Sequence, residues 1–168
     1  NTFLEKVSTG VHLTLEEASA AMEAVLDQKT ADAQIAGLLM GLKTKGETVE
    51  ELAGLVKILR ERAEKIRVED PDGLEVADTD GGGIGLSHVS IAAALVVAAG
   101  GGTVALTGYS RFPGGGGSAD VLEALGVKME MSKKKIEEGL NRFGLGYFSV
   151  PLFQPALKAV SRVRRDLA

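Results

Sequence analysis

A glycine-rich segment at residues 78–87 constrains the fold of this chain more than any other feature. It reads Asp-Thr-Asp-Gly-Gly-Gly-Ile-Gly-Leu-Ser and overlaps the end of a strand-like apolar pattern at residues 74–79. After it, residues 88–99 form an uncharged run rich in Ala and Val, which predicts a buried helix. Glycine lets a backbone bend sharply and approach a ligand, and a helix N-terminus presents free N–H groups to an anion. The order strand, loop, helix therefore favours a phosphate-binding loop, with a flexible connection that carries no ligand as the alternative.

The charges in and near the glycine segments leave two interpretations open. Asp78 and Asp80 repel a bare phosphate, and residues 78–87 contain no lysine. Such carboxylates can indicate a bridging Mg²⁺, or they can be hydrated acids at a strand end. A second glycine-rich segment, residues 108–117, has Arg111 as its only cation. It can wrap a diphosphate through backbone N–H groups or form a disordered lid.

The second half of the chain alternates strand and helix patterns. Strands are expected at residues 103–107, 127–129 and 147–150, and helices at residues 118–125 and 132–144 and from Pro155 onward. Strands that alternate with helices predict a parallel sheet with right-handed crossovers. A turn cluster at residues 69–73 precedes this half and is the best candidate for a hinge.

The first third of the chain predicts three helices. Thr14 with Glu17, and Thr48 with Glu51, form two capping-box patterns. Thr30 is the expected cap of the helix between them. Apolar residues recur at helical spacing after each of these positions, so each helix has a face that can be buried.

Composition excludes several classes of protein. The net charge of −4 lacks the basic field of nucleic-acid binders, and this argues against nucleic acid as a partner. There is no cysteine, so disulfides and thiolate metal sites are excluded. The longest apolar run, residues 89–99, is too short to span a bilayer. We expect a cytoplasmic protein with no signal peptide and no membrane association.

Two histidines, His88 and His12, are the only imidazoles. His88 stands at a predicted helix start, where the dipole favours a neutral, hydrogen-bonding ring. It can be catalytic or a structural polar contact. His12 is expected at the surface. No Ser/His/Asp or metal-ligand constellation is visible elsewhere, so no catalytic residue is assigned.

Several stretches resemble anthranilate phosphoribosyltransferases, in one register through nearly the whole chain. Within residues 13–66 they are Gln-Ile-Ala-Gly-Leu-Leu-Met at 34–40 and Lys-Gly-Glu-Thr-Val-Glu-Glu-Leu at 45–52. Gly-Ser-Ala-Asp-Val-Leu-Glu-Ala-Leu-Gly follows at 117–126, and Pro-Ala-Leu-Lys-Ala-Val stands at 155–160 with Val-Arg-Arg-Asp-Leu at 163–167. Pyrimidine nucleoside phosphorylases share the architecture and are the nearest alternative family.

The resemblance implies an α/β fold, truncated relative to the family, with a small N-terminal helical module and a partial, mostly parallel sheet domain. A helical dimerisation module is expected at residues 1–68, an α/β phosphate-binding segment at 74–150, and a helix that returns to the helical module at 151–168. The implied protein is a homodimer of the tryptophan biosynthesis pathway. It would transfer phosphoribose from phosphoribosyl diphosphate to anthranilate, with Mg²⁺ on the diphosphate.

The family's first loop motif, Gly-Thr-Gly-Gly-Asp-Gly, aligns with residues 78–83. The resemblance therefore implies substrate contacts by Thr79, Gly81 and Gly83. The family's Asn-Ile-Ser-Thr aligns with residues 88–91, which places His88 beside substrate and Ser90 at the position of a metal-contacting serine.

The second loop matches the family less well. The family's Lys-His-Gly-Asn aligns with residues 106–109, so Leu106 replaces a lysine. Gly108 and Tyr109 stand at positions for which the resemblance implies substrate binding. The family's paired serines fall on residues 113 and 114, which are Pro and Gly. Ser118 matches a phosphate-contacting serine, and Arg164 matches an arginine that contacts the aromatic acceptor.

These replacements predict impaired or absent transferase activity. A lysine that faces diphosphate donates charge-assisted hydrogen bonds worth roughly 1.5–3 kcal/mol each, and leucine cannot donate them. The family's Asp-Glu pair that holds Mg²⁺ has no counterpart in the 168 residues. A non-catalytic homologue or fragment that acts as a binding or dimerisation module is therefore the alternative.

Overall fold

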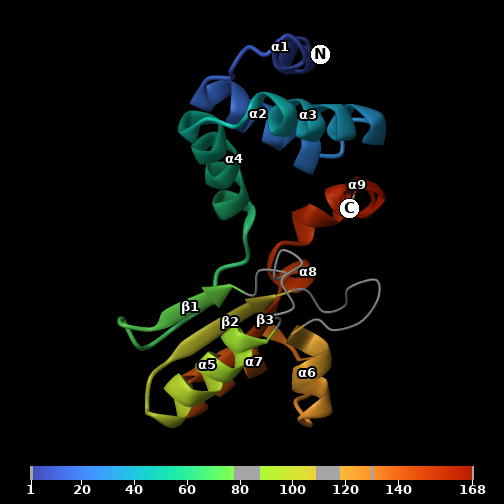
Figure 1. The fold of residues 1–168 in the computed structure, drawn as a ribbon. Coiled ribbons are helices and arrows are strands. Elements are labelled where there is room, and N and C mark those ends of the chain that lie inside the picture. Colours follow the sequence, from blue (N-terminus) through green and yellow to red (C-terminus); the bar gives the residue numbers. More distant parts are fainter. Residues whose placement is uncertain (1, 78–87, 109–117, 130, 168) are drawn as a thin grey trace. The chain divides into compact units, whose positions relative to one another are not determined.

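A computed structural model describes residues 2–77, 88–108, 118–129 and 131–167 (Figure 1). The chain divides into two compact units. The helical unit comprises residues 1–63 and 154–168, and the α/β unit comprises residues 64–153. None of the helices in the described ranges is long and apolar enough to cross a membrane.

The helical unit begins with four helices where the sequence predicted three. They are α1 (Thr2–Ser8), α2 (Leu15–Leu26), α3 (Asp32–Lys45) and α4 (Val49–Arg62). A 3₁₀ helix, η2 (Pro155–Val160), and α9 (Ser161–Leu167) complete the unit. Val160 and Val163, from these last two elements, are buried in one apolar cluster with residues of the first helices. The two ends of the sequence therefore share one core.

The two predicted capping boxes are confirmed. Glu17 N donates to Thr14 Oγ1 at 3.2 Å, and Thr14 N donates to Glu17 Oε2 at 3.0 Å. Thr48 and Glu51 make the same reciprocal pair at the start of α4. The predicted cap at Thr30 is wrong, because α3 begins one residue later. Its N-cap is Ala31, whose N–H donates to the side chain of Gln34.

Glu51 also carries a buried ion pair that the sequence did not indicate. Its side chain is fully buried, and the Lys45 side chain is only 5% exposed, with Nζ 2.6 Å from Glu51 Oε2. The carboxylate accepts further hydrogen bonds from Leu13 N at 2.8 Å and Thr48 N at 2.9 Å. Burial by itself would raise the pKa of Glu51, but the backbone and Lys45 donors outweigh it and lower the pKa to about 2. His12 lies at the outer end of this network, more than half exposed as expected, with Nδ1 2.9 Å from Lys45 Nζ.

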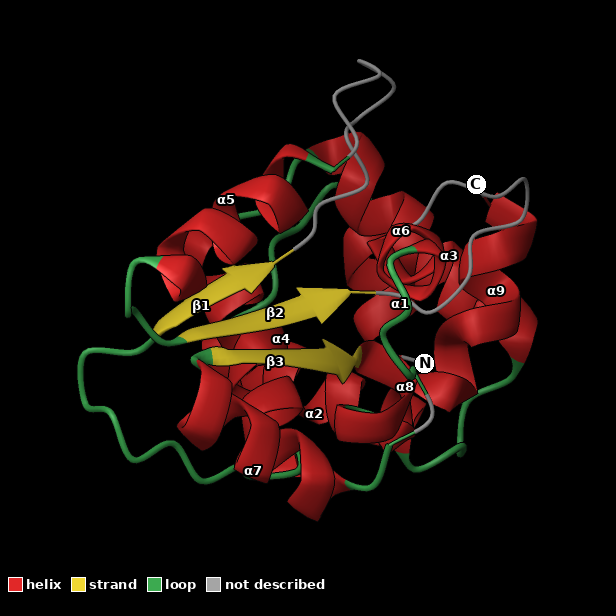
Figure 2. Ribbon diagram, turned by 90° about the horizontal axis from the view of Figure 1, so that it is seen from below, coloured by secondary structure: helices red, strands yellow, loops and turns green. Residues whose placement is uncertain are grey.

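The α/β unit is built on a three-stranded parallel sheet in the order β1-β2-β3. Its elements are β1 (Leu74–Ala77), α5 (Val89–Ala99), β2 (Val104–Gly108), α6 (Ser118–Ala124), α7 (Lys133–Phe143), β3 (Leu145–Ser149) and α8 (Val150–Phe153). Figure 2 shows α5 on one side of the three strands and α7 on the other. The predicted α/β class with a parallel sheet is therefore confirmed.

The sheet has an apolar core on each face. On one face, Ile91 of α5 and Leu122 of α6 cluster with Leu106 and Tyr147. On the other face, Ile136 and Leu140 of α7 pack in a cluster with Phe148 and Phe153. The ring centroids of Phe148 and Phe153 lie 4.8 Å apart in an edge-to-face arrangement. Tyr147 and Phe148 are neighbours in β3, so their side chains point to opposite faces of the sheet. Tyr147 therefore packs in the first cluster and Phe148 in the second.

The strand predicted at residues 127–129 is wrong. Gly126 has a φ of 87°, and Val127 N donates to Leu122 O at 2.9 Å, which closes the end of α6. Val127 and Met129 pack against the cluster around Leu106. Their apolar character thus comes from packing beyond a helix end and not from pairing in the sheet.

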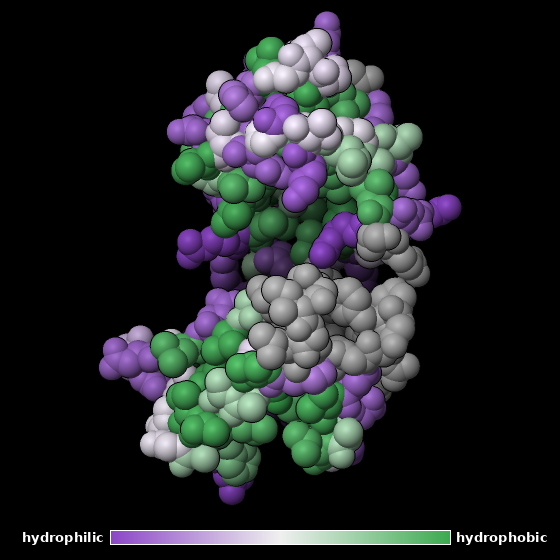
Figure 3. All heavy atoms as spheres, viewed as in Figure 1, coloured by the Kyte–Doolittle hydropathy of each residue, from purple (hydrophilic) through white to green (hydrophobic). Residues whose placement is uncertain are grey.

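Helix α5 forms where it was predicted, but the prediction that it is buried is wrong. Of the residues in this helix, only Ile91 and Ala94 are buried. Val89 is 61% exposed and Val96 is 72% exposed. Apolar side chains therefore form part of the surface of the α/β unit (Figure 3).

Candidate functional site

The carboxyl ends of the strands define the candidate site. Because the strands are parallel, β1, β2 and β3 all end at the same edge of the sheet, where Gly108 pairs with Ser149. In chain order, α5 follows β1 and α6 follows β2, so both helices begin from this edge. Open parallel sheets bind their ligands at this edge, where helix N-termini offer N–H groups to anions.

Four predicted contact residues lie outside the described residues. These are Thr79, Gly81, Gly83 and Tyr109. The structure places the other five: Gly108, His88, Ser90 and Ser118 belong to the α/β unit, and Arg164 lies on α9 of the helical unit. Gly108 is the buried last residue of β2, at the edge just described.

His88 occupies the N-cap position of α5. Its φ of 92° is in the left-handed region, which costs a non-glycine residue roughly 1–3 kcal/mol. Its side chain makes no capping hydrogen bond, and Nδ1 is a buried atom with no hydrogen-bond partner among the described residues. Ser90 follows in the first turn of α5 and is half-buried. Strain and a buried polar atom therefore coincide at the start of α5.

Ser118 is the first residue of α6 and is 1% exposed. Its hydroxyl has no hydrogen-bond partner within the part of the chain that is described. A buried polar atom without a partner costs roughly 1–3 kcal/mol, so such groups are rare without a function. Ser118 Oγ is thus a candidate donor to a ligand.

Leu106 is buried where the aligned family motif has lysine. It lies in β2, with 1% of its surface exposed, and packs in the apolar cluster with Ile91 and Leu122. An alkyl side chain in this position contributes packing and no hydrogen bond. The residue therefore belongs to the core of the α/β unit.

The described residues do not by themselves form a Mg²⁺ site. They contain no group of three or more His, Asp or Glu side chains that could hold a metal ion. Mg²⁺ prefers oxygen ligands, and the Ser90 hydroxyl supplies at most one. Asp78 and Asp80, the carboxylates that can indicate a bridging Mg²⁺, lie outside the described residues, and we assign no chemical step to a metal ion.

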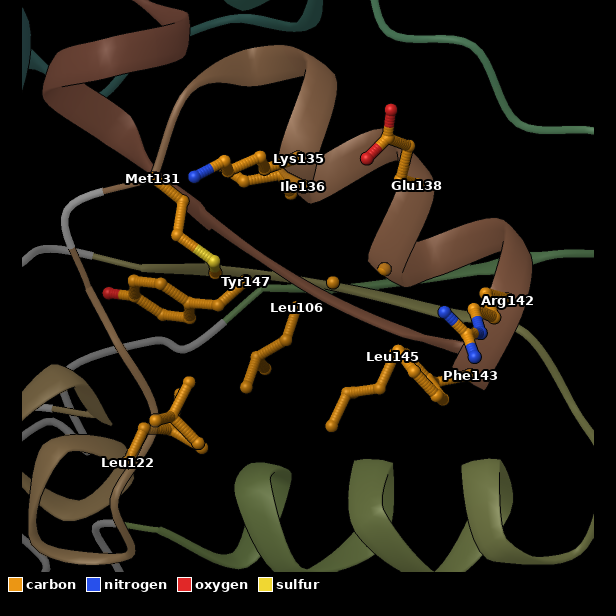
Figure 4. Close-up of a pocket in the computed structure, with 13 residues that line it drawn as sticks. Leu106, Leu122, Met131, Lys135, Ile136, Glu138, Arg142, Phe143, Leu145 and Tyr147 are labelled. Carbon is orange, nitrogen blue, oxygen red and sulfur yellow. The ribbon is translucent and has the colours of Figure 1, made fainter.

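A pocket of about 440 Å³ in the α/β unit was missed by sequence reasoning. Leu106, Leu145, Leu122 and Tyr147 project into the space between the strands and the neighbouring helices, and Ile136 faces it from α7 (Figure 4). The rest of the lining is Val127, Met131, Lys135, Glu138, Gly139, Arg142, Phe143 and Gly146. A Cβ at Gly146 would meet the Phe148 ring at 3.0 Å, so close packing explains this glycine, and the lining residues form no sequence motif that indicates a pocket. The lining is mainly apolar, so we assign it no catalytic chemistry.

The chain matches two domain models of one glycosyl transferase family. Residues 1–63 match its helical bundle domain, and residues 71–168 match its α/β domain. The anthranilate phosphoribosyltransferase of Salinibacter ruber is 38% identical over 167 residues, which cover 99% of this chain and 48% of the relative. That of Aquifex aeolicus is 39% identical over 165 residues, covering 98% of this chain and 48% of the relative.

Solved structures agree with these matches. The anthranilate phosphoribosyltransferase of Thermus thermophilus superposes with a TM-score of 0.89 at 37% identity, over 99% of this chain and 50% of that one. The Saccharomyces cerevisiae enzyme, solved with phosphoribosyl diphosphate and Mg, shares the fold at a TM-score of 0.83 and 18% identity, over 99% of this chain and 50% of its own. The chain thus spans about half the length of the relatives it matches. It belongs to the glycosyl transferase family of these two domains, and within that family it is similar to the anthranilate phosphoribosyltransferases.

Proposed function

We propose that this chain carries the phosphoribosyl diphosphate-binding part of an anthranilate phosphoribosyltransferase. The observation that carries this proposal is the 38% identity to such an enzyme along 99% of the chain. The candidate site supports it, because two helices begin from the carboxyl edge of the sheet and a buried hydroxyl stands at the start of one of them.

In this proposal, the helix starts bind the diphosphate through oriented donors. The Ser118 hydroxyl donates to a phosphate oxygen, and the first backbone N–H groups of α5 face the same anion. His88 Nδ1 is the second polar atom available there. Transfer of phosphoribose depends on positioning the acceptor and stabilising the leaving diphosphate, so fixed donors of this kind are the protein's main contribution.

We further propose that the 168 residues alone transfer phosphoribose weakly or not at all. Leu106 supplies no charged donor to the diphosphate, and about half of the relatives' length lies outside the match. Arg164 aligns with a family arginine that contacts the aromatic acceptor, so it would contact anthranilate. The helical unit would form a homodimer, since Leu52 and Val56, one turn apart on α4, are each 49% exposed.

A thermal-shift titration tests the binding proposal. Phosphoribosyl diphosphate with Mg²⁺ should raise the Tm of the wild-type chain by mass action. Ser118→Ala should weaken binding about 10- to 100-fold, because a hydrogen bond to a charged group is worth roughly 1.5–3 kcal/mol. Ser132→Ala is the matched control, since Ser132 precedes α7 in the same unit and makes no capping hydrogen bond. An unchanged wild-type Tm at millimolar ligand would refute the proposal.

A turnover assay separates the candidate functions. Loss of anthranilate fluorescence with phosphoribosyl diphosphate measures transfer, and we expect a rate near the uncatalysed one for the chain alone. Ligand binding without turnover identifies a binding or dimerisation module. Phosphate-dependent release of a pyrimidine base would instead place the chain among the nucleoside phosphorylases.

A further inference from the structure

The apolar pocket of about 440 Å³ in the α/β unit is large enough to hold a small molecule. Ligand pockets in proteins commonly measure about 300–1,000 Å³ and have apolar walls with a few polar groups. Leu106, Leu122 and Tyr147 line it and are each at most 7% exposed. Their side chains are turned toward one space, with Leu145 beside them (Figure 4). The apolar part of a ligand would therefore leave water for a hydrocarbon surface there.

Gly139 widens this pocket on the side of α7. It lies in the interior of the helix, where glycine is destabilising relative to alanine. Outside its own helix, a Cβ at this position would meet only the carbonyl oxygen of Leu145, at 3.8 Å, which is an ordinary contact. Neither helix stability nor crowding therefore explains a glycine here. A larger side chain at this position would instead take up space that now belongs to the pocket.

Two cationic side chains of α7 line the pocket and have no acidic partner among the described residues. They are Lys135 and Arg142, at the two ends of the stretch of α7 that reaches the pocket. Arg142 Cζ lies 5.0 Å from the ring centre of Phe143, a contact that brings no opposite formal charge. The one carboxylate of the described lining, Glu138, lies 3.8 Å from the ammonium group of Lys134, which is outside the lining. The rim of the pocket is therefore positively charged.

We propose that this pocket binds an alkyl carboxylate, a linear apolar chain that ends in one anionic group. The apolar side chains bury the alkyl chain, and a cation at the rim pairs with the carboxylate. Lys135 and Arg142 are seven residues apart on one helix, which is roughly 10 Å along its axis, so the lining favours an extended chain over a compact ring. None of the described residues to which the resemblance assigns a substrate contact lines this pocket, so the proposal is independent of the proposed transferase function.

Isothermal titration calorimetry with sodium octanoate tests the proposal on the unaltered chain, in the absence of phosphoribosyl diphosphate. We expect saturable binding of one octanoate per chain. Hexanoate should bind roughly 15-fold more weakly, because each buried methylene group strengthens binding about fourfold. Octanamide has the same chain length and no charge, so it should bind about two- to fivefold more weakly than octanoate. No binding of octanoate at millimolar concentration, or equal binding of octanoate and octanamide, would overturn the proposal.

Substitutions on α7 locate the site. Gly139→Leu should weaken octanoate binding at least about tenfold, because its side chain fills space that the alkyl chain needs. The double variant Lys135→Gln with Arg142→Gln should bind octanoate no better than octanamide, and it should keep the Tm because both side chains are exposed. Lys133→Gln is the matched control, since Lys133 is on the same helix, lies 3.5 Å from Glu64 and does not line the pocket. Octanoate binding that the double variant leaves unchanged, or that the control weakens equally, would contradict the assigned site.

Discussion

Replacement of Glu51 with glutamine tests the buried ion pair of the helical unit. Glutamine keeps the shape of the side chain and one carbonyl acceptor, but it removes the charge that faces Lys45 Nζ at 2.6 Å. Lys45 would then be a buried ammonium group without its counter-ion, since its side chain is only 5% exposed. Breaking a buried pair from one side typically costs roughly 3–5 kcal/mol.

The pKa of Glu51 gives a second route to the magnitude. A pKa lowered from 4.5 to about 2 is worth about 3 kcal/mol at neutral pH, because each unit corresponds to about 1.4 kcal/mol. The folded-state pKa is depressed, so this stability is present above pH 4.5 and is lost as the pH falls toward 2. We therefore expect Glu51→Gln to lower the free energy of unfolding by about 3 kcal/mol at pH 7 and by clearly less at pH 3, where part of this stabilisation is already lost.

Urea unfolding followed by far-ultraviolet circular dichroism measures both values. Glu17→Gln is the matched control, because Glu17 has the same place in the other capping box and pairs with Lys6 at the surface. A surface pair contributes roughly 0–1 kcal/mol, so the control should lose less than about 1 kcal/mol. Equal losses in the two variants, or a Glu51→Gln loss that does not shrink between pH 7 and pH 3, would show that the buried pair is not what stabilises the unit.

Two further predictions concern the backbone: one replaces a glycine in a crowded position, and the other replaces a non-glycine residue with a positive φ. Gly54→Ala should lower the free energy of unfolding by about 1–3 kcal/mol in urea, because its Cβ would collide with the carbonyl oxygen of Leu15 and lie 2.9 Å from Ala18 Cβ. Gly37→Ala, whose Cβ meets only a side chain at 3.4 Å, should be neutral or slightly stabilising, and a similar loss there would contradict the packing argument. His88→Gly should raise the Tm of the unliganded chain, since it relieves a φ of 92° worth about 1 kcal/mol or more; a lower Tm would mean that the imidazole stabilises the fold.

Features that depend on neighbouring residues can be predicted from the amino-acid sequence. The capping boxes at Thr14 and Thr48 satisfy N–H groups within one turn, so their spacing predicts them without reference to the rest of the fold. The strand and helix order of the α/β unit follows from local hydrophobic periodicity in the same way, except that residues 127–129 are not a strand and that α8 was not predicted. The family register, which covers nearly the whole chain, is also a property of sequence alone.

Features that depend on residues far apart in the chain follow from the three-dimensional fold. Glu51 has the spacing of an ordinary capping glutamate, but its burial depends on contacts such as the hydrogen bond from Leu13 N, 38 residues earlier in the chain. Residues 127–129 read as a strand because they are apolar, but they pack beside α6 instead of pairing. Helix α5 reads as buried because it is apolar, yet Val96 is exposed. Local pattern reports how much apolar surface a segment has, whereas burial depends on which other segments fold against it.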